Sequence, residues 1–226
     1  MRAPLSVVIP TFNAEEALPA CLSALFEGVQ CGLIRELIVV DGGSSDRTVE
    51  VSQESGADVV QVAPSRGGQL RVGAEKARGR WLLFLHADTV LAEGWTESVM
   101  SHMGHPDRAG YFKLRFDTIG LAPTVVSGWA NLRSRVFGLP YGDQGLLIAR
   151  ETYAHAGGYP DVPLMEDVAL ALALSGRLVA LPSTAETSGE KYAKAGWLRR
   201  GTRNLTILLR YFMGASPERL AADYRR

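Results

Sequence analysis

Two residues that can bind a metal ion, His86 and Asp88, follow a run of large apolar residues in RWLLFLHADTV (80–90). Apolar runs of this length are typical of buried strands. In an open α/β sheet, ligands bind in the crevice at the carboxyl ends of the strands. An imidazole and a carboxylate at such an end can therefore hold a ligand or a cation, although a turn after the strand would also explain them.

Polar residues follow two earlier apolar runs in the same way, in PTFNAEE (10–16) and DGGSSDRT (41–48). Asp41 precedes two glycines whose backbone freedom suits a tight turn, and its carboxylate could accept hydrogen bonds from a base or a ribose. We expect Asp46 to cap the following helix. Because three strands would bring such groups to one edge of a sheet, the sequence predicts a binding site there.

The elements that must position these residues alternate between short apolar runs and amphipathic segments. The first three of the runs LSVVI, ELIVV, ADVVQV and RWLLFL are each followed by a helical pattern closed by glycine. Continuous apolar runs are typical of parallel strands covered by helices on both faces. Further along, we expect strands at 110–116 and 145–149, a helix at 166–176, and helical structure from Lys194 to Tyr224. We divide the chain into an α/β domain at 1–190 and a basic helical extension at 191–226, packed on the domain or continuous with it.

Composition argues against several classes of protein. The 226 residues carry 24 Lys and Arg against 24 Asp and Glu, so no net charge would hold nucleic acid. No stretch approaches the ~20 apolar residues of a membrane-spanning helix, and the N-terminal apolar run is too short for a signal peptide. Cys21 and Cys31 form no CxxC pair, so we expect reduced thiols in a cytoplasmic protein. Pro10 stands where the phosphate-binding turn of a dinucleotide fold would begin, and no GxGxxG follows the first strand, which argues against a nicotinamide or flavin enzyme.

Four segments together resemble family-two glycosyltransferases with the GT-A fold: SVVIPTFNAEE, ELIVVDGGSSDRT, GAEKARGRWLLFLHADT and MEDVALALAL. The chain is most similar to small bacterial transferases whose metal motif reads His-Ala-Asp, which are relatives of carotenoid-acid glycosyltransferases. The resemblance implies an α/β, Rossmann-like fold with a mostly parallel central sheet. It also implies inverting transfer of a sugar from a nucleotide-diphosphate sugar to a hydroxyl or carboxyl group of a lipophilic or saccharide acceptor.

The resemblance also implies roles for individual residues on the donor side. A divalent cation, Mg²⁺ or Mn²⁺, is expected on Asp88, where it would bridge to the diphosphate. The family usually has a carboxylate where this chain has His86, which could bind the metal, contact the ribose or orient Asp88. The residues expected around the nucleoside and the diphosphate are Pro10, Thr11, Asn13, Glu15, Asp41, Arg66, Gly67, Gly68, Gln69 and Ala87.

Glu166 and Asp167 supply acids at the start of a predicted helix, where they would also complement the helix dipole. The resemblance implies that Asp167 is the base that takes the proton of the acceptor hydroxyl. Adjacent helical residues diverge by about 100°, so we expect only one of the two acids to face the acceptor. In YGDQG, Asp143 and Gln144 are expected on the acceptor side, or in a plain turn between the glycines.

The segment KYAKAGWLRRGTRNLTILLRYFMG (191–214) mixes basic residues with aromatic and aliphatic ones. Such a helix can lie on the inner face of a membrane, or it can pack on its own domain or on a second copy in a homodimer. Two other classes of protein stay open. A nucleotidyltransferase would carry a glycine-rich loop with a basic residue after the first strand, which PTFNAEE lacks. A non-catalytic, membrane-associated nucleotide-binding protein is suggested by His86 alone.

Overall fold

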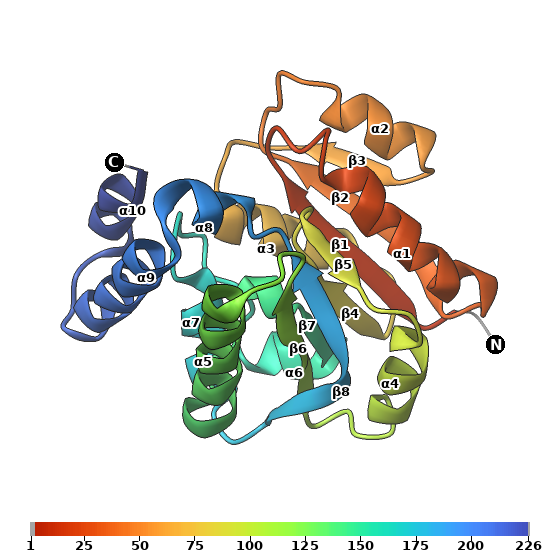
Figure 1. Cartoon of the computed structure of the whole chain (residues 1–226). Coiled ribbons are helices and arrows are strands. Elements are labelled where there is room, and N and C mark those ends of the chain that lie inside the picture. Colours follow the sequence, from red (N-terminus) through yellow and green to blue (C-terminus); the bar gives the residue numbers. More distant parts are fainter. Residues whose placement is uncertain (1–2, 226) are drawn as a thin grey trace.

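The computed structural model describes residues 3–225, apart from the side chains of Lys191 and Arg225. Within them one sheet of eight strands runs in the order β3-β2-β1-β4-β7-β6-β8-β5 (Figure 1). The strands β3, β2, β1 and β4 are parallel to one another, and β7 pairs with β4 in the antiparallel sense. Beyond β7, β6 pairs with β8 in parallel, and β5 closes the edge in the antiparallel sense. The strands are β1 (Leu5–Thr11), β2 (Ile34–Asp41), β3 (Asp58–Gln61), β4 (Trp81–Phe84), β5 (Thr89–Leu91), β6 (Ala109–Phe116), β7 (Leu146–Ala149) and β8 (Leu178–Thr187).

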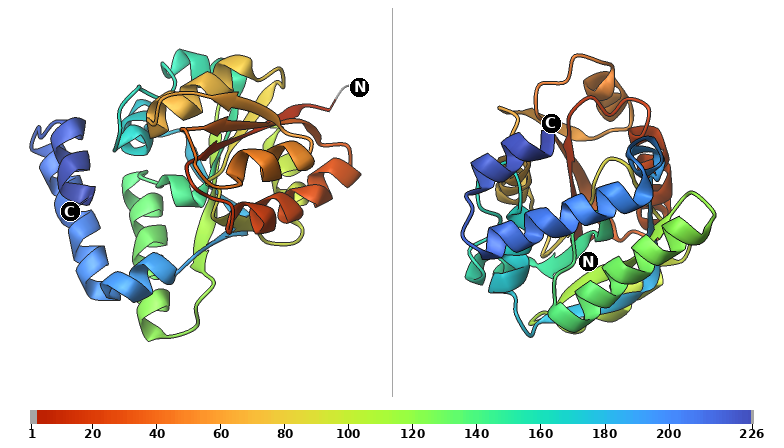
Figure 2. Two further views of the ribbon diagram at one scale, coloured as in Figure 1. Left: turned by 90° about the horizontal axis from the view of Figure 1, so that it is seen from above. Right: turned by 60° about the vertical axis from the view of Figure 1, so that its left-hand side comes forward.

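Helices cover both faces of this sheet (Figure 2). Successive side chains of a strand point to opposite faces, so Val7 joins a core cluster with α1 and α4, while Val8 joins a second cluster with α3, α6 and α7. The expected α/β architecture is therefore confirmed. The helices are α1 (Leu18–Gln30), α2 (Thr48–Glu54), α3 (Arg66–Lys76), α4 (Trp95–His102), α5 (Leu121–Phe137), α6 (Arg150–His155), α7 (Glu166–Ala173), α8 (Glu190–Ala195), α9 (Trp197–Phe212) and α10 (Pro217–Arg225), with a 3₁₀ turn η1 at Gly142–Gln144.

The expected helical C-terminal segment is broken into three helices. Gly196 and Gly214, both at positive φ, stand at the two breaks. Helices α9 and α10 pack on α7 through a cluster that contains Val168, Ile207 and Leu220. Trp197, at the start of α9, packs against Phe116 of β6, with ring centroids 4.9 Å apart. Residues 191–225 thus lie against the α/β domain, and no helix within 3–225 has both the length and the apolar character to span a bilayer.

The approach of α3 to β1 yields a stability prediction. A Cβ atom on Gly73 would lie well inside van der Waals contact of Val8 Cγ1. Gly73→Ala is expected to lower the free energy of unfolding by about 1–3 kcal/mol, because the crowded helix must shift. Gly128→Ala in α5 is the matched control, since a Cβ there meets nothing within 4 Å and alanine favours a helix by about 0.5–1 kcal/mol. Urea unfolding measures both variants, and equal effects would contradict close packing of α3 on β1.

Candidate active site

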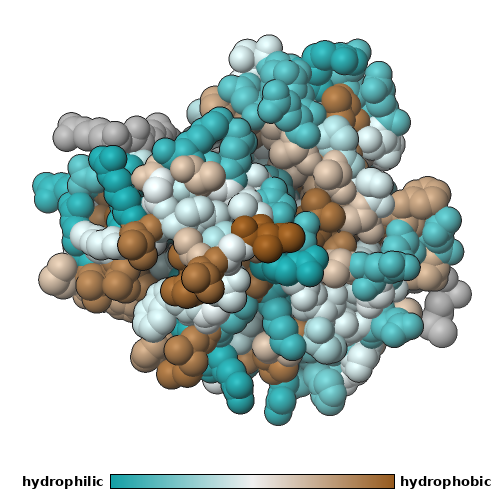
Figure 3. All heavy atoms as spheres, viewed as in Figure 1, coloured by the Kyte–Doolittle hydropathy of each residue, from teal (hydrophilic) through white to brown (hydrophobic). Residues whose placement is uncertain are grey.

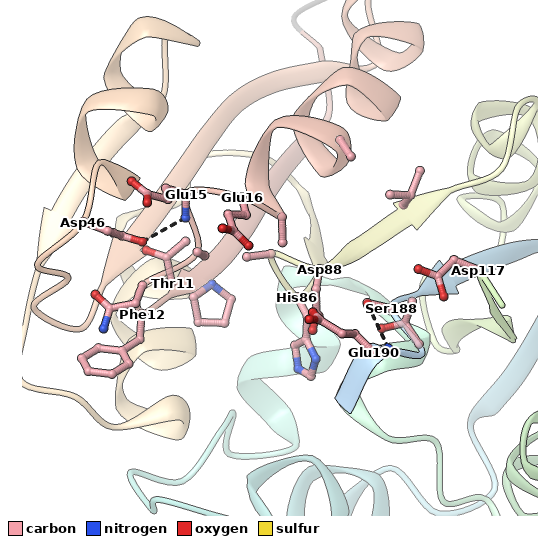
Figure 4. A pocket seen from close by; sticks show the side chains of 18 of the residues that line it. Thr11, Phe12, Glu15, Glu16, Asp46, His86, Asp88, Asp117, Ser188 and Glu190 are labelled. Carbon is pink, nitrogen blue, oxygen red and sulfur yellow. Dashed lines mark hydrogen bonds between the residues drawn. The ribbon is translucent and has the colours of Figure 1, made fainter. Parts of the chain in front are cut away.

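A cavity of about 860 Å³, here called the large cavity, opens at the carboxyl ends of β1 and β4. Residues 10–17 line it from the end of β1 and the β1–α1 loop, and Ser188 and Glu190 line it from beyond β8. Figure 4 shows His86 and Asp88 between these two walls. The structure therefore brings together the strand-end residues that the sequence grouped.

Two loops on one wall of the large cavity are held together by hydrogen bonds from predicted site residues. Asn13 Oδ1 accepts from the Ser45 backbone N–H at 2.9 Å, and Glu15 Oε2 accepts from the Arg47 N–H at 2.8 Å. The Glu15 N–H in turn donates to Asp46 Oδ2. Asn13 and Glu15 line the cavity, and their side chains also hold the β1–α1 loop against the β2–α2 loop.

Asp41 lies beneath this wall and is fully buried. Its Oδ1 accepts from Thr11 Oγ1 at 3.0 Å, and its Oδ2 accepts from the Gly43 and Ser44 N–H groups at 2.9 and 2.8 Å. Thr11 lines the large cavity, but Asp41 is not among the lining residues. The carboxylate thus closes the turn after β2. Asp46 makes the expected capping contact, because its Oδ1 accepts from the N–H of Thr48, the first residue of α2.

The segment RGGQ (66–69) begins α3 and ties it to the sheet. Gln69 is buried, and its Nε2 donates to the carbonyl oxygens of Thr11 and Val40 at 2.8 and 2.7 Å. A Cβ atom on Gly67 would collide with the Pro160 carbonyl oxygen, so this glycine is required by the neighbouring loop. Arg66 remains half exposed and lines the large cavity.

A second cavity of about 420 Å³, here called the acid cavity, adjoins the large cavity and shares Arg66, His86 and Asp88 with it. Both Glu166 and Asp167 line the acid cavity. They are not equally open to it, because Glu166 is 1% exposed while Asp167 is partly exposed, and the expectation that only one of them faces the acceptor stays a prediction. Met165 precedes them at φ +68°, and the first turn of α7 begins at the wall of this cavity.

The two acids of α7 differ in what surrounds them. Asp167 Oδ2 accepts from the Gly142 N–H at 2.9 Å, and its Oδ1 accepts from the Val168 N–H. Glu166 is 1% exposed, its Oε2 has no hydrogen-bond partner within 3–225, and its Oε1 lies 3.7 Å from Arg66 Nε. Burial, followed by the charge of Asp167, raises the pKa of Glu166 to about 7.

Asp143 and Gln144 lie on η1 and point to different places. Asp143 lines the acid cavity, and burial raises its pKa to about 6, with the charges of Asp167 and Asp88 adding to the shift against the opposing charge of Arg133. Gln144 is fully buried, with its Nε2 donating to the Phe112 carbonyl oxygen at 3.1 Å. The structure brings Asp143 to the acids and leaves Gln144 inside the packed interior.

His86 and Asp88 lie where the two cavities meet. The imidazole packs against the backbone of Gly142, since a Cβ atom there would collide with His86 Nε2. Ala87, between them, lines the large cavity together with Pro10. Nearby, burial and then the charge of Asp88 raise the pKa of Cys21 to about 12, so this thiol stays protonated.

The donor set fits a cation shared with a ligand. Within 3–225, no three His, Cys, Asp or Glu side chains converge on one point. His86 and Asp88 would supply at most two protein ligands, and the remaining positions would fall to phosphate oxygens and water. This is the way in which Mg²⁺ is usually bound in proteins that bind phosphate substrates.

The C-terminal residues that line the acid cavity were not predicted from the sequence to do so. Arg200 of α9 lies over the ring of Tyr192 at 5.1 Å, and its Nη2 donates to Tyr224 Oη at 3.0 Å. All three residues line the acid cavity. The helical spacing of Arg200, Arg203 and Ile207, which places them on one side of α9, was the signal that this side faces protein.

Comparisons with known proteins agree with this fold. Staphylococcus aureus TarS (residues 1–349) superposes with a TM-score of 0.65 at 16% identity, over 91% of this chain and 65% of that one. Glucosyl-3-phosphoglycerate synthase from Mycobacterium tuberculosis, in complex with Mn²⁺ and uridine-diphosphate-glucose, gives a TM-score of 0.57 at 19% identity, over 82% of this chain and 69% of that one. The fold is that of the GT-A glycosyltransferases, as the sequence resemblance implied.

The family follows from the sequence match. The model for "Glycosyl transferase family 2" matches residues 6–122, and the chain belongs to this family. A PGL/p-HBAD biosynthesis glycosyltransferase of Mycobacterium tuberculosis is 37% identical over 111 residues, which cover 42% of this chain and 40% of the relative. The chain thus spans about two fifths of the length of that relative.

The raised pKa of Glu166 predicts a pH-dependent stability difference. Between about 4.5 and about 7 the folded protein keeps a proton on Glu166 that the unfolded chain releases, so this residue lowers stability as the pH rises. Glu166→Gln removes the titration. The variant should gain about 1–3 kcal/mol in unfolding free energy relative to the wild type between pH 4.5 and pH 8.

Urea unfolding of the two proteins at several pH values measures this difference. Other titrating groups, Asp143 among them, are present in both proteins and largely cancel. A difference that stays constant with pH would show that Glu166 ionises normally in the folded protein.

Proposed function

We propose that the protein is an inverting glycosyltransferase that moves a sugar from a nucleotide-diphosphate sugar to a hydroxyl or carboxyl group of an acceptor. One observation carries the proposal: Arg66, His86 and Asp88 line both cavities. A diphosphate held by these residues would lie beside the carboxyl groups of Glu166 and Asp167. Donor and acceptor would then meet at the shared wall.

The large cavity suits the donor. Its volume of about 860 Å³ lies in the range of small-molecule and cofactor sites. Arg66 supplies positive charge for a diphosphate, and Thr11, Asn13 and Glu15 line the end toward the β1–α1 loop. The solved synthase that binds Mn²⁺ and uridine-diphosphate-glucose shares the fold, which supports a donor of this chemical class.

A divalent cation, Mg²⁺ or Mn²⁺, is part of the proposal. Asp88 would hold it, with His86 as a second ligand or as a neighbour that orients Asp88. The cation would neutralise charge on the departing diphosphate. Arg66 Nε lies 3.7 Å from Glu166 Oε1. Arg66 would therefore contribute positive charge to the diphosphate from the side of the acid cavity.

Asp167 is the proposed base. The Gly142 N–H fixes one of its oxygens, which keeps the carboxylate oriented in the acid cavity. As the acceptor oxygen bonds to the anomeric carbon, the bond from that carbon to the diphosphate oxygen breaks, and the acceptor proton passes to Asp167. Glu166, with a pKa raised to about 7, holds its own proton for much of the time at neutral pH and is the weaker candidate.

Two other classes of protein fit the cavities less well. A nucleotidyltransferase needs basic groups around a triphosphate, but among the described side chains that line the large cavity the only Lys or Arg is Arg66. A non-catalytic nucleotide-binding protein would have no need for Asp88 and Asp167 on the walls of one cavity. The acceptor, lipophilic or saccharide, would occupy the acid cavity, whose walls mix Phe116 and Tyr192 with acids and Arg200.

Contact with the inner face of a membrane belongs to the same proposal, with a homodimer interface as the alternative. Three arginines of α9 face α10: Arg200 bonds to Tyr224, Arg203 to the Asp223 carbonyl oxygen, and Arg210 to the Asp223 carboxylate. Arg199 is exposed. Most of the arginines of α9 therefore hold α10 in place and are not available to lipid headgroups. Membrane contact requires a surface in addition to these arginines.

Calorimetry with uridine diphosphate tests the donor and metal parts of the proposal. Binding should be at least tenfold weaker with chelator than with Mn²⁺, because the cation links Asp88 to the diphosphate. Asp88→Ala should abolish that difference, and His86→Asp should retain it. Binding that is the same with Mn²⁺ and with chelator would contradict the metal, and loss of the effect in His86→Asp would make the imidazole an essential ligand.

Turnover with a hydroxyl acceptor tests the base. Asp167→Asn should reduce turnover by roughly 10²–10⁴-fold with uridine diphosphate binding unchanged, because the amide keeps the shape of the side chain but takes no proton. Glu166→Gln is the matched control and should lose less. The reverse order would assign the base to Glu166, and full activity of both variants would leave the pair with a structural role. A carboxylate acceptor is unsuitable because it is already ionised.

A further inference from the structure

Helix α5 presents an apolar face to solvent. Leu121, Val125, Trp129, Leu132 and Val136 are spaced by three and four residues, which places them on one side of the helix. Each is at least 47% exposed. An apolar stripe on a surface helix normally faces the core, so this face marks a surface that meets something other than water.

Helix α9 extends the same surface. Leu198, Leu205, Leu209 and Phe212 recur at helical spacing, and each is at least 40% exposed. Apolar residues gather over α5 and α9 on the face shown in Figure 3. Trp129 of α5 and Leu205 of α9 line one small cavity between the helices, here called the seam cavity. The two stripes therefore form one surface, here called the α5–α9 surface.

The charges of the two helices are all of one sign. Helices α5 and α9 together contain six arginines and no aspartate or glutamate, but Arg133 is buried and three arginines of α9 bond to α10. Arg135 and Arg199 are exposed on these helices, on turns that also carry residues of the apolar stripes. Exposed apolar residues flanked by arginine are the chemistry by which helices bind anionic lipid, since apolar side chains enter the acyl boundary and the cations meet headgroups.

The α5–α9 surface adjoins the acceptor side of the site. Tyr141, Asp143, Tyr192 and Asn204 line both the seam cavity and the acid cavity. The seam cavity measures about 40 Å³, little more than the volume that a water molecule occupies in the liquid. The acid cavity is thus separated from the surface by a thin layer of side chains between α5 and α9.

We propose that the α5–α9 surface docks the protein on an anionic lipid bilayer, with α5 as a principal contact and the acid cavity on the bilayer side. The apolar stripes supply burial, and the exposed Arg135 and Arg199 supply attraction to the headgroups. In this orientation a lipid-borne acceptor would reach Asp143 and Asp167 from the bilayer. This consequence rests on the proposed function. Docking itself does not.

Cosedimentation with vesicles tests the proposal on the full chain. Vesicles that contain phosphatidylglycerol in phosphatidylcholine should sediment the protein, and added salt should release part of it as the charges are screened. Leu132→Asp and Leu209→Asp should each weaken the apparent affinity by about tenfold or more, because each removes a leucine that docking would bury in the acyl boundary. Both positions are exposed, so folding should survive. Phe26→Asp, at an equally exposed apolar residue of α1, is the matched control and should bind like the wild type.

Tryptophan fluorescence supplies a second measurement. Trp129 is 47% exposed, whereas Trp81 and Trp95 are buried and Trp197, at the start of α9, packs against Phe116 and Tyr192. Emission should shift to shorter wavelength with phosphatidylglycerol vesicles, and Trp129→Phe should remove most of that shift. A shift that persists when both Trp129 and Trp197 are replaced by phenylalanine would place the contact elsewhere.

Three results would overturn the proposal: no binding to vesicles of either composition, equal losses in Phe26→Asp and Leu132→Asp, or a dimer in light scattering that Leu132→Asp dissociates. The last result would assign the surface to a second copy of the chain. Calorimetry with uridine diphosphate on the same proteins separates the two proposals. Failure of the wild type to bind the nucleotide would contradict the glycosyltransferase function and leave the docking result standing.

Discussion

The hydrogen bond from the Gly142 N–H to Asp167 joins the two halves of the site. The backbone of Gly142 has Asp167 as its bonding partner and the His86 imidazole in packing contact, so any side chain at this position would push His86 away. The 3₁₀ turn at Gly142–Gln144 therefore sets the distance between the proposed metal residues and the proposed base. The resemblance to the family implies a carboxylate at the position of His86. The imidazole found there is consistent with the contact to Gly142, because its flat ring packs against a residue without a side chain.

Four carboxyl groups, those of Asp88, Asp143, Glu166 and Asp167, line the acid cavity. Burial, together with the charge of neighbouring carboxylates, disfavours the ionised forms of Glu166 and Asp143 and raises the pKa of both. Arg66 lies close enough to offset part of this charge. Met165, at φ +68°, holds a conformation that costs about 1–3 kcal/mol in a residue with a side chain. Met165 holds this conformation directly before α7, at the point where the helix begins at the cavity wall.

The first half of the fold and the location of the site could be predicted from sequence, because parallel strands buried on both faces leave continuous apolar runs and their polar residues follow at one edge. Helix α5 escaped prediction because its exposed side is apolar, which hides the usual amphipathic pattern. Strand β8 was not predicted either. It contains Pro182, and its pairing with β6 shifts register between Tyr111 and Lys113. The opposite orientations of Asp143 and Gln144 depend on a single 3₁₀ turn, and the partners of Arg200 and Arg203 lie on the next helix, 24 and 20 residues further along the chain. Neither leaves a local pattern.

A crystal structure with uridine diphosphate and Mn²⁺ would show whether the donor and the acids meet across Gly142. We expect an anomalous peak for Mn²⁺ between Asp88 and the diphosphate in the large cavity, with the terminal phosphate turned toward Asp167. A nucleotide bound outside the large cavity, or a terminal phosphate directed away from the acid cavity, would contradict this expectation.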